Sequence, residues 1–263
     1  MRLVLILALA AVLAPAQSIQ EKGRQVVDEA VAALGGPKFL SLQNKVEKGR
    51  VYSFQHREVS GLAKCTIYTK YLPLPADPDP KKVYFIERQA FGDNEAWYYQ
   101  FTTDDAYEVT FRGARPMDEE TVGRVRERRW RDVFYLLLTH HNDPGMIYEY
   151  QTTEVVDNQP LVKVDITDPA NRVVSVWFHY TTKLPMRAVF QWRDEHRVPH
   201  EEVTIYDKYR DVGGGVMLPF VVQRSRDGER IFSLFAESVT INQPDIDTKF
   251  ELPDAVKILQ REK

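Results

Sequence analysis

The chain has 263 residues, and its 35 Lys and Arg nearly balance its 38 Asp and Glu, which gives a formal net charge of −3. Because charges of both signs are mixed along the chain, a nucleic acid is not an expected partner. Cys65 is the only cysteine, so no internal disulfide can form and packing must stabilise the fold.

The N-terminal segment has the pattern of an export signal. Met1-Arg2 is a short basic start, Leu3–Leu13 is apolar throughout, and Ala14-Pro15-Ala16 provides the small residues that signal peptidase recognises. The apolar run is shorter than the ~20 residues that a membrane-spanning helix needs. We therefore expect a signal peptide over residues 1–16, cleavage after Ala16 and a periplasmic protein without a lipid anchor, in which residues 17–263 form a single domain.

The first predicted element of the mature chain is a helix from Ser18 to Leu34. Its apolar residues recur at helical spacing, and Gly35-Gly36-Pro37 ends it because glycine followed by proline stops a helix. The apolar residues are Val26, Val27, Ala30, Val31 and Leu34. A single apolar stripe on a surface helix predicts packing against a sheet.

After this helix the pattern changes to short runs rich in Val, Tyr, Phe, Trp and Thr, separated by turn residues. Such runs predict β-strands. The first five are Lys45–Phe54, Leu62–Tyr71, Lys82–Arg88, Ala96–Phe101 and Ala106–Phe111. The proline-rich stretch Leu72–Pro80 predicts a loop, and Gly92-Asp93 predicts a tight hairpin.

A second helix is predicted from Thr121 to His141, after the acidic residues 118–120. Its apolar residues share one stripe: Trp130, Phe134, Leu137 and Leu138. Much of the remaining surface carries Arg124, Arg126, Arg128, Arg129 and Arg131. A solvated face is the ordinary interpretation of these arginines, and contact with anionic lipid head groups or an acidic partner is the functional one.

Seven more strands are predicted downstream, joined by short turns. They are Ile147–Thr153, Pro160–Thr167, Arg172–Tyr180, Leu184–Arg193, Val203–Tyr209, Val216–Arg224 and Glu229–Ile241. Short turns predict antiparallel neighbours, so the fold class is mainly β with a few helices (α+β). A helix ~10 Å wide cannot cover about a dozen strands at ~4.8 Å spacing. We therefore expect one strongly curved antiparallel sheet that forms an unclosed β-barrel, with the helices as a lid over an apolar cavity.

Alternation along several strands places bulky apolar side chains on one face. In Leu184–Arg193, for example, Phe190 and Trp192 alternate with polar residues. The residues predicted to line the cavity are Trp97, Tyr99, Phe101, Trp130, Phe134, Trp177, Phe190, Trp192 and Phe220. The alternative is a filled core made of the same rings, in which case the protein would be a structural or assembly module of the cell envelope.

Three motifs occur in order within Val155–Pro253. They are TTKLPMR (181–187), YDKYRDVGGGVMLP (206–219) and VTINQPDID (239–247), followed by Phe250. Together they resemble the LolA-like family of periplasmic lipoprotein carriers and related outer-membrane lipoprotein-sorting proteins. The resemblance implies an unclosed barrel with lid helices that holds acyl chains or another lipid-like group. The expected cargo is a lipid or an acylated protein. The functional interpretation of the arginine-rich helix adds a handover partner in the envelope and peripheral contact with a membrane.

The chain also departs from this family. The stretch Leu72–Pro80 and the arginine-rich helix are additional, and the family's lid-locking arginine has no matching position.

Catalytic chemistry is not predicted. His140 and His141 are adjacent in a predicted helix and so point in different directions, unlike the i, i+4 histidines of a zinc-binding helix. His196 and His200 flank a charged turn, and Gly213-Gly214-Gly215 lacks the lysine of a phosphate-binding loop. We therefore predict no enzyme activity, no metal and no cofactor. A metal-dependent hydrolase that uses the histidines is the remaining alternative.

Overall fold

The computed structural model describes residues 17–194, 196–252 and 257–260, so the predicted signal peptide lies outside the described part. Within that part, thirteen strands form one sheet in which each strand is antiparallel to its neighbours. They are β1 (Asn44–Gln55), β2 (Glu58–Tyr71), β3 (Phe85–Phe91), β4 (Trp97–Phe101), β5 (Ala106–Thr110), β6 (Gly113–Pro116), β7 (Ile147–Val156), β8 (Gln159–Thr167), β9 (Val173–His179), β10 (Pro185–Arg193), β11 (Pro199–Asp211), β12 (Met217–Arg226) and β13 (Glu229–Ile241). The predicted fold class is confirmed, and β6 is the strand that the sequence did not predict.

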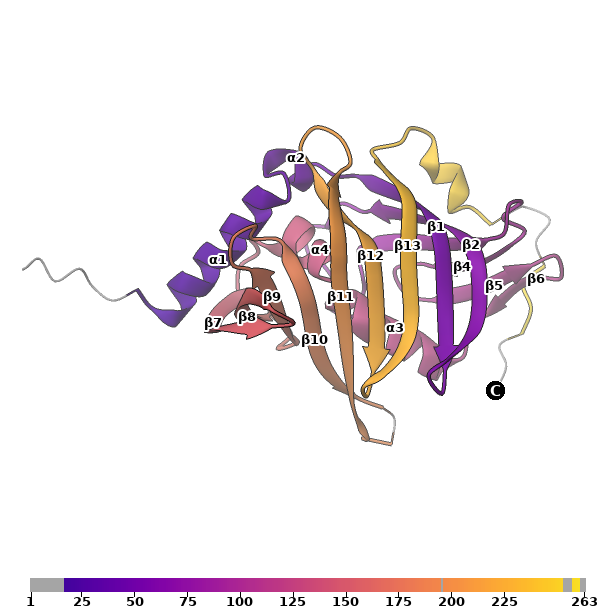
Figure 1. Ribbon diagram of the computed structural model, residues 1–263. Helices are drawn as coiled ribbons and strands as arrows, with labels where there is room; N and C mark the ends of the chain where they lie inside the picture. Colours follow the sequence, from indigo (N-terminus) through magenta and orange to yellow (C-terminus); the bar gives the residue numbers. More distant parts are fainter. Residues whose placement is uncertain (1–16, 195, 253–256, 261–263) are drawn as a thin grey trace, which may run out of the picture.

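The strand order explains why the sheet stays open (Figure 1). From β6 the strands run backwards along the chain to β1, which pairs with β13, and then from β13 backwards to β7. The two edges of the sheet are therefore β6 and β7, which follow one another in the chain. The segment that joins them has to pass from one edge to the other, and its helices lie over the concave face.

This connecting segment contains α3 (Glu119–Trp130), the short α4 (Val133–Tyr135) and the π-helical turn η1 (Leu136–His140). The prediction of one continuous helix was wrong. Asp132 has an extended backbone, and its carboxylate accepts a hydrogen bond from the backbone N–H of Tyr135 at 2.9 Å, which starts a new helix. Because of this break, Trp130 packs near Phe85 and Tyr135, whereas Phe134 packs in the main core.

The predicted N-terminal helix is confirmed as α1 (Ile19–Ala33). Ser18 caps it together with Glu21, and each of these two side chains accepts a hydrogen bond from the backbone of the other residue. The apolar stripe of α1 packs on β7 and β8, and the main core lies between α1 and the concave face of β7–β12. Two short helices were not predicted, α2 (Pro37–Leu40) and the 3₁₀ turn η2 (Ile246–Lys249).

Replacing a helical glycine by alanine is expected to change stability in opposite directions at two positions. In α1, a Cβ on Gly23 would lie 2.5 Å from the carbonyl oxygen of Tyr148, so Gly23→Ala is expected to destabilise the protein by about 1–3 kcal/mol. In α3, nothing lies within 4 Å of the corresponding position on Gly123, so Gly123→Ala is expected to stabilise it by about 0.5–1 kcal/mol. Urea unfolding of both variants measures the difference. Equal effects would contradict the close contact between α1 and β7.

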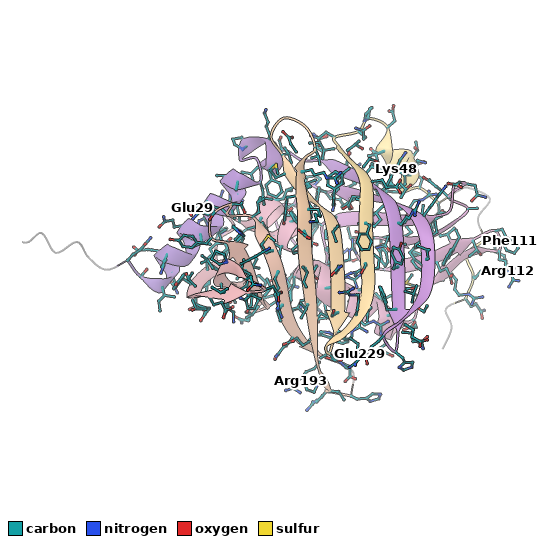
Figure 2. All side chains as sticks on the ribbon, in the orientation of Figure 1. Glu29, Lys48, Phe111, Arg112, Arg193 and Glu229 are labelled. Atoms are coloured by element: carbon teal, nitrogen blue, oxygen red, sulfur yellow. The ribbon has the colours of Figure 1, made fainter. Side chains whose placement is uncertain are left out.

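Other segments cover both edges of the sheet. Beside β6, the backbone N–H of Ala114 donates to the carbonyl of Lys257 at 2.9 Å, and that of Leu259 donates to the carbonyl of Ala114 at 2.8 Å. Beside β7 lies α1, and such cover prevents another chain from adding a strand. The hairpin tip between β5 and β6 projects away from the sheet with Phe111, which is 90% exposed, and Arg112 (Figure 2).

No helix within the described residues has the length and apolar content needed to cross a membrane.

Candidate functional site

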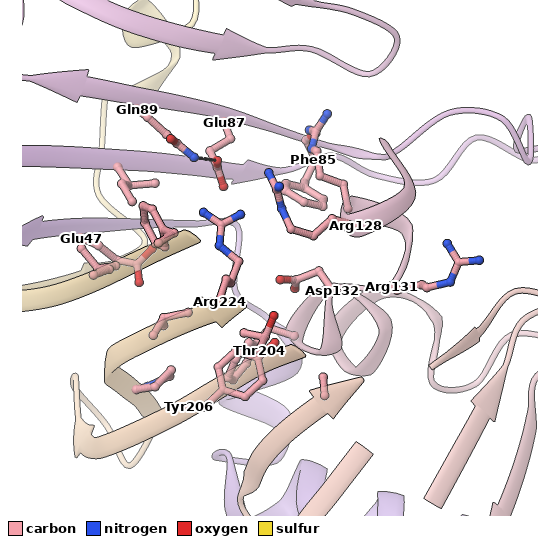
Figure 3. Close-up of a pocket in the computed structure, with 18 of the residues that line it drawn as sticks. Glu47, Phe85, Glu87, Gln89, Arg128, Arg131, Asp132, Thr204, Tyr206 and Arg224 are labelled. Carbon is pink, nitrogen blue, oxygen red and sulfur yellow. Dashed lines mark hydrogen bonds between the residues drawn. The ribbon is translucent and has the colours of Figure 1, made fainter. Parts of the chain in front are cut away.

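A cavity of about 120 Å³ lies between the lid helices and the concave face of the sheet, and we call it the inner cavity (Figure 3). Its apolar wall includes Ile67, Phe85, Phe134, Phe190 and Leu234. Its charged residues are Lys45, Glu47, Glu87, Arg128, Arg129, Arg131, Asp132 and Arg224. The prediction of an apolar cavity is therefore corrected, because charged side chains occupy many of the inward positions.

Strand register explains which side chains face inward. In a strand, alternate residues share a face, so Lys45 and Glu47 of β1 point to the same side. Across the pair β11–β12, Thr204 lies opposite Arg224 and Tyr206 opposite Val222, and all four line the inner cavity. The concave face thus carries a mixed row of polar and apolar groups beneath α3.

A second cavity of about 470 Å³ opens beside α3, and we call it the mouth cavity. Tyr99, Phe101, Met117, Val125 and Ile231 form much of its apolar wall. Four residues line both cavities: Gln89, Arg128, Arg224 and Phe232. The two cavities are therefore neighbours that share one wall beneath the lid helix.

Lys45 and Glu47 form an ion pair on the inner cavity wall, with 2.9 Å between the ammonium and the carboxylate. Burial alone would lower the pKa of Lys45, but Glu47, Tyr71 and Asp132 together raise it above its ordinary value. The ammonium therefore stays charged at neutral pH.

Arg129 attaches α3 to the sheet. It is 7% exposed, and its guanidinium donates to the carbonyl of Thr102 at 2.6 Å and also to the carbonyl of Phe85. The guanidinium carbon lies 4.4 Å from the centre of the Phe85 ring. Burial lowers the pKa of Arg129 to about 10, so it remains a cation at neutral pH.

The structure brings several of the predicted site residues to the two cavities. Phe134 and Phe190 line the inner cavity, and Tyr99 and Phe101 line the mouth cavity. Trp97 lies on the same face of β4 as Tyr99, with which it makes an edge-to-face ring contact, and is 40% exposed. These five residues remain the proposed ligand-contacting aromatics.

Two other aromatics pack on the concave face without lining these cavities. Phe220 is buried in the main core, and Trp192 packs against that core and stacks on His200 with 4.8 Å between ring centres. Phe220 and Trp192 therefore belong to the packed core behind the cavity walls.

For two residues the predicted location is corrected. Trp177 alternates with Val176 and Phe178, which face the main core, so it lies on the opposite, convex face, where its indole N–H donates to Glu154 at 2.6 Å. Trp130 is the last residue of α3 and does not line the inner cavity. Its indole N–H donates to the carbonyl of Lys82 at 3.1 Å.

Trp130 instead lines a separate pocket of about 340 Å³ between the proline-rich loop and η1. His140 also lines it, 2.6 Å from Asp143, and Asp168 lies there in an ion pair with Arg172. In the described part of the chain, no three His, Cys, Asp or Glu side chains form a group that could hold a metal ion. Cys65 is buried on the concave side of β2, and burial raises the pKa of its thiol to about 12.

No family model and no curated protein sequence matches this chain. Solved structures match it in fold. A DUF1329 family protein from Desulfovibrio piger aligns over 89% of this chain and 98% of its own, with a TM-score of 0.60 and 12% identity.

Two further structures match over a similar length. An outer membrane lipoprotein-sorting protein domain from Vibrio parahaemolyticus aligns over 88% of this chain and 97% of its own, with a TM-score of 0.56 and 9% identity. A LolA superfamily protein from Nitrosomonas europaea aligns over 88% and 95%, with a TM-score of 0.50 and 10% identity. The chain therefore has a LolA-like fold, as the sequence motifs predicted.

Proposed function

We propose that this protein is an exported, non-enzymatic binder and carrier of a lipid-like or acylated ligand. The observation that carries the proposal is the adjacency of the two cavities, since the aromatic mouth cavity and the inner cavity beneath α3 share four wall residues. The fold adds support by analogy, because two proteins of the same fold are named for lipoprotein sorting and for the LolA superfamily. The proposed location is the periplasm, after removal of residues 1–16.

The sizes of the cavities indicate how such a ligand would bind. Ligand pockets commonly measure ~300–1,000 Å³, so the mouth cavity is large enough for part of an acyl chain and the inner cavity is smaller than this range. An acyl chain would enter at the mouth and reach the inner cavity when α3 moves away from the sheet. Each CH₂ group removed from water would contribute about 0.8 kcal/mol before ordering costs.

The break between α3 and α4 gives the lid a place to move. Arg131 and Asp132 lie between the two helices, and the Asp132 cap lets α4 stay in the main core while α3 changes its angle. Hinges of this kind are a few residues at the ends of elements. The proposed cycle is thus opening at α3, ligand entry through the mouth cavity and closure.

The test is native mass spectrometry, with organic extraction, of protein purified from the periplasm. We expect the mass of a chain that begins at Gln17, increased by that of a bound lipid or acylated peptide. Delipidated protein should take up palmitate. Thr204 lines the inner cavity, so Thr204→Trp is expected to weaken palmitate binding by about tenfold by filling that space.

The matched control is Thr240→Trp on the exposed side of β13, which should bind as the wild type does. Melting temperatures of both variants check that they fold. A wild type at its bare sequence mass, with no uptake of palmitate, would overturn the proposal and favour an envelope module with a filled core.

A further inference from the structure

Most charged side chains on the walls of the inner and mouth cavities have a partner within the described residues. Lys45 is paired with Glu47, Arg129 with two backbone carbonyls, Arg131 with Glu127, and Asp118 and Asp132 with backbone N–H groups. Arg115 and Glu108 are also engaged, Glu108 with the indole of Trp97. These contacts hold the walls and the lid in place.

Arg128 and Arg224 differ from this group. Arg128 comes from α3 and Arg224 from β12, and both line both cavities. Across residues 17–194, 196–252 and 257–260, neither guanidinium makes a hydrogen bond or a close ion pair. Figure 3 shows their side chains reaching from opposite walls into the same part of the cavity.

The Arg224 side chain is held in position without use of its N–H groups. Its guanidinium carbon lies 4.0 Å from the centre of the Phe232 ring. Stacking on a ring face occupies the plane of the guanidinium and leaves its N–H edge directed outward. The edge is therefore available to a group inside the cavity.

The charges of these two arginines destabilise one another. Burial and, to a smaller extent, repulsion from Arg128 lower the pKa of Arg224 to about 9, and burial also lowers the pKa of Arg128. Glu87 and Glu202 act in the opposite direction, but Glu87 is hydrogen-bonded to Gln89 and Glu202 to Arg226. An anion between the arginines would relieve the repulsion and accept hydrogen bonds from both guanidinium groups.

We infer that the site binds an amphiphile whose anionic end group, a carboxylate or a phosphate, lies between Arg128 and Arg224. Guanidinium groups bind both anions through paired N–H···O bonds, which strengthen away from water. When α3 moves away from the sheet, the hydrocarbon then extends past Phe232 into the inner cavity, along Phe134 and Phe190. This inference rests on the proposed function and specifies the ligand class and its orientation.

The test compares three ligands on delipidated protein: palmitate, lysophosphatidic acid and neutral monopalmitoylglycerol. Arg128→Gln and Arg224→Gln are each expected to weaken binding of the two anionic ligands by about tenfold or more and to leave the neutral one within about threefold. Arg126→Gln is the control on the same helix, because Arg126 donates to the carbonyl of Asp104 and lines neither cavity.

A second measurement separates ligand binding from a structural role. Without ligand, both variants should melt at a higher temperature than the wild type, because a repelled and partly buried charge has been removed. A structural role for these arginines requires the opposite shift, so lower melting temperatures would count against the inference.

The binding results distinguish the inference from the proposed function. Equal binding of palmitate and monopalmitoylglycerol, unchanged in both variants, would refute the anionic site while the carrier function stands. Uptake of inorganic phosphate without uptake of any of the three amphiphiles would overturn both.

Discussion

Replacing Glu47 by leucine is expected to destabilise the protein by about 3–5 kcal/mol, because it removes one partner of a buried ion pair. Glu47 is 5% exposed, and its carboxylate lies 2.9 Å from the ammonium of Lys45. Burial by itself would lower the pKa of Lys45, and Glu47 is the main group that raises it above its ordinary value. Without Glu47, the partly buried ammonium of Lys45 would keep only Asp132 as a weaker counter-charge. Urea unfolding at neutral pH measures the loss.

The double variant Lys45→Met, Glu47→Leu supplies the control. It removes both charges and keeps similar side-chain volumes, so we expect most of the lost stability to return. The difference between the double variant and the sum of the single ones gives the coupling between the two residues. A Glu47→Leu protein within about 1 kcal/mol of the wild type would show that water or Asp132 already compensates Lys45.

The sheet could be predicted from the sequence because strand periodicity is local. Each run of alternating residues marks a strand wherever the rest of the chain lies, and short turns specify antiparallel neighbours. The strand β6 was missed because Gly113 and Pro116 are unfavourable in strands, and the C-terminal segment that pairs with β6 is distant in sequence.

Alternation does not tell which face of a strand becomes concave. In β9, Val176, Trp177 and Phe178 are all apolar, so alternation does not show that Trp177 belongs to the convex face. The core there is built from valines that pack under α1, and Trp177 is left to pair with Glu154 outside.

Part of the charged cavity lining could have been predicted from the sequence, but the rows of aromatic residues drew the assignment to apolar side chains. Lys45 and Glu47 alternate with Val46, so β1 has a polar pair on the face that became concave. Glu87 and Gln89 of β3 share that face, but Arg88 between them is also charged, so β3 carries no such pattern. Asp132 was also readable as a helix start, since aspartate before an apolar run is a common N-cap. The proximity of Arg128 and Arg224 could not be predicted from the sequence, because it depends on how α3 crosses β12.

The open sheet makes the lid a consequence of topology. Because β6 and β7 are the two edges and are consecutive in the chain, the connection between them covers the concave face. Only part of that connection is fixed in the main core: α4 and η1 contribute Val133, Phe134, Leu136 and Leu137, whereas α3 contributes none of its residues. The smaller cluster under α3 joins Val122 and Val125 to Phe101 and Ala106. We therefore expect α3 to open at lower free energy than α4.

Replacing Arg129 by methionine is expected to reduce the free energy of lid opening by about 3 kcal/mol, because two carbonyls would lose a charged donor. The affected carbonyls belong to Thr102 and Phe85, which lie on the sheet side of the contact. Hydrogen exchange of the α3 amides should become about 100-fold faster, while exchange in β8 and β9 changes much less. Arg126→Gln, which removes one exposed contact of the same helix, should leave exchange nearly unchanged.

Ligand release should follow the same opening. If α3 is the lid, Arg129→Met accelerates dissociation of bound palmitate and leaves the preference for anionic over neutral amphiphiles intact, because Arg128 and Arg224 are still present. If α3 is instead a fixed layer of the fold, its amides and those of β8 and β9 will exchange faster together, as global stability falls. The two readouts thus separate a residue that closes the site from the residues that select its ligand.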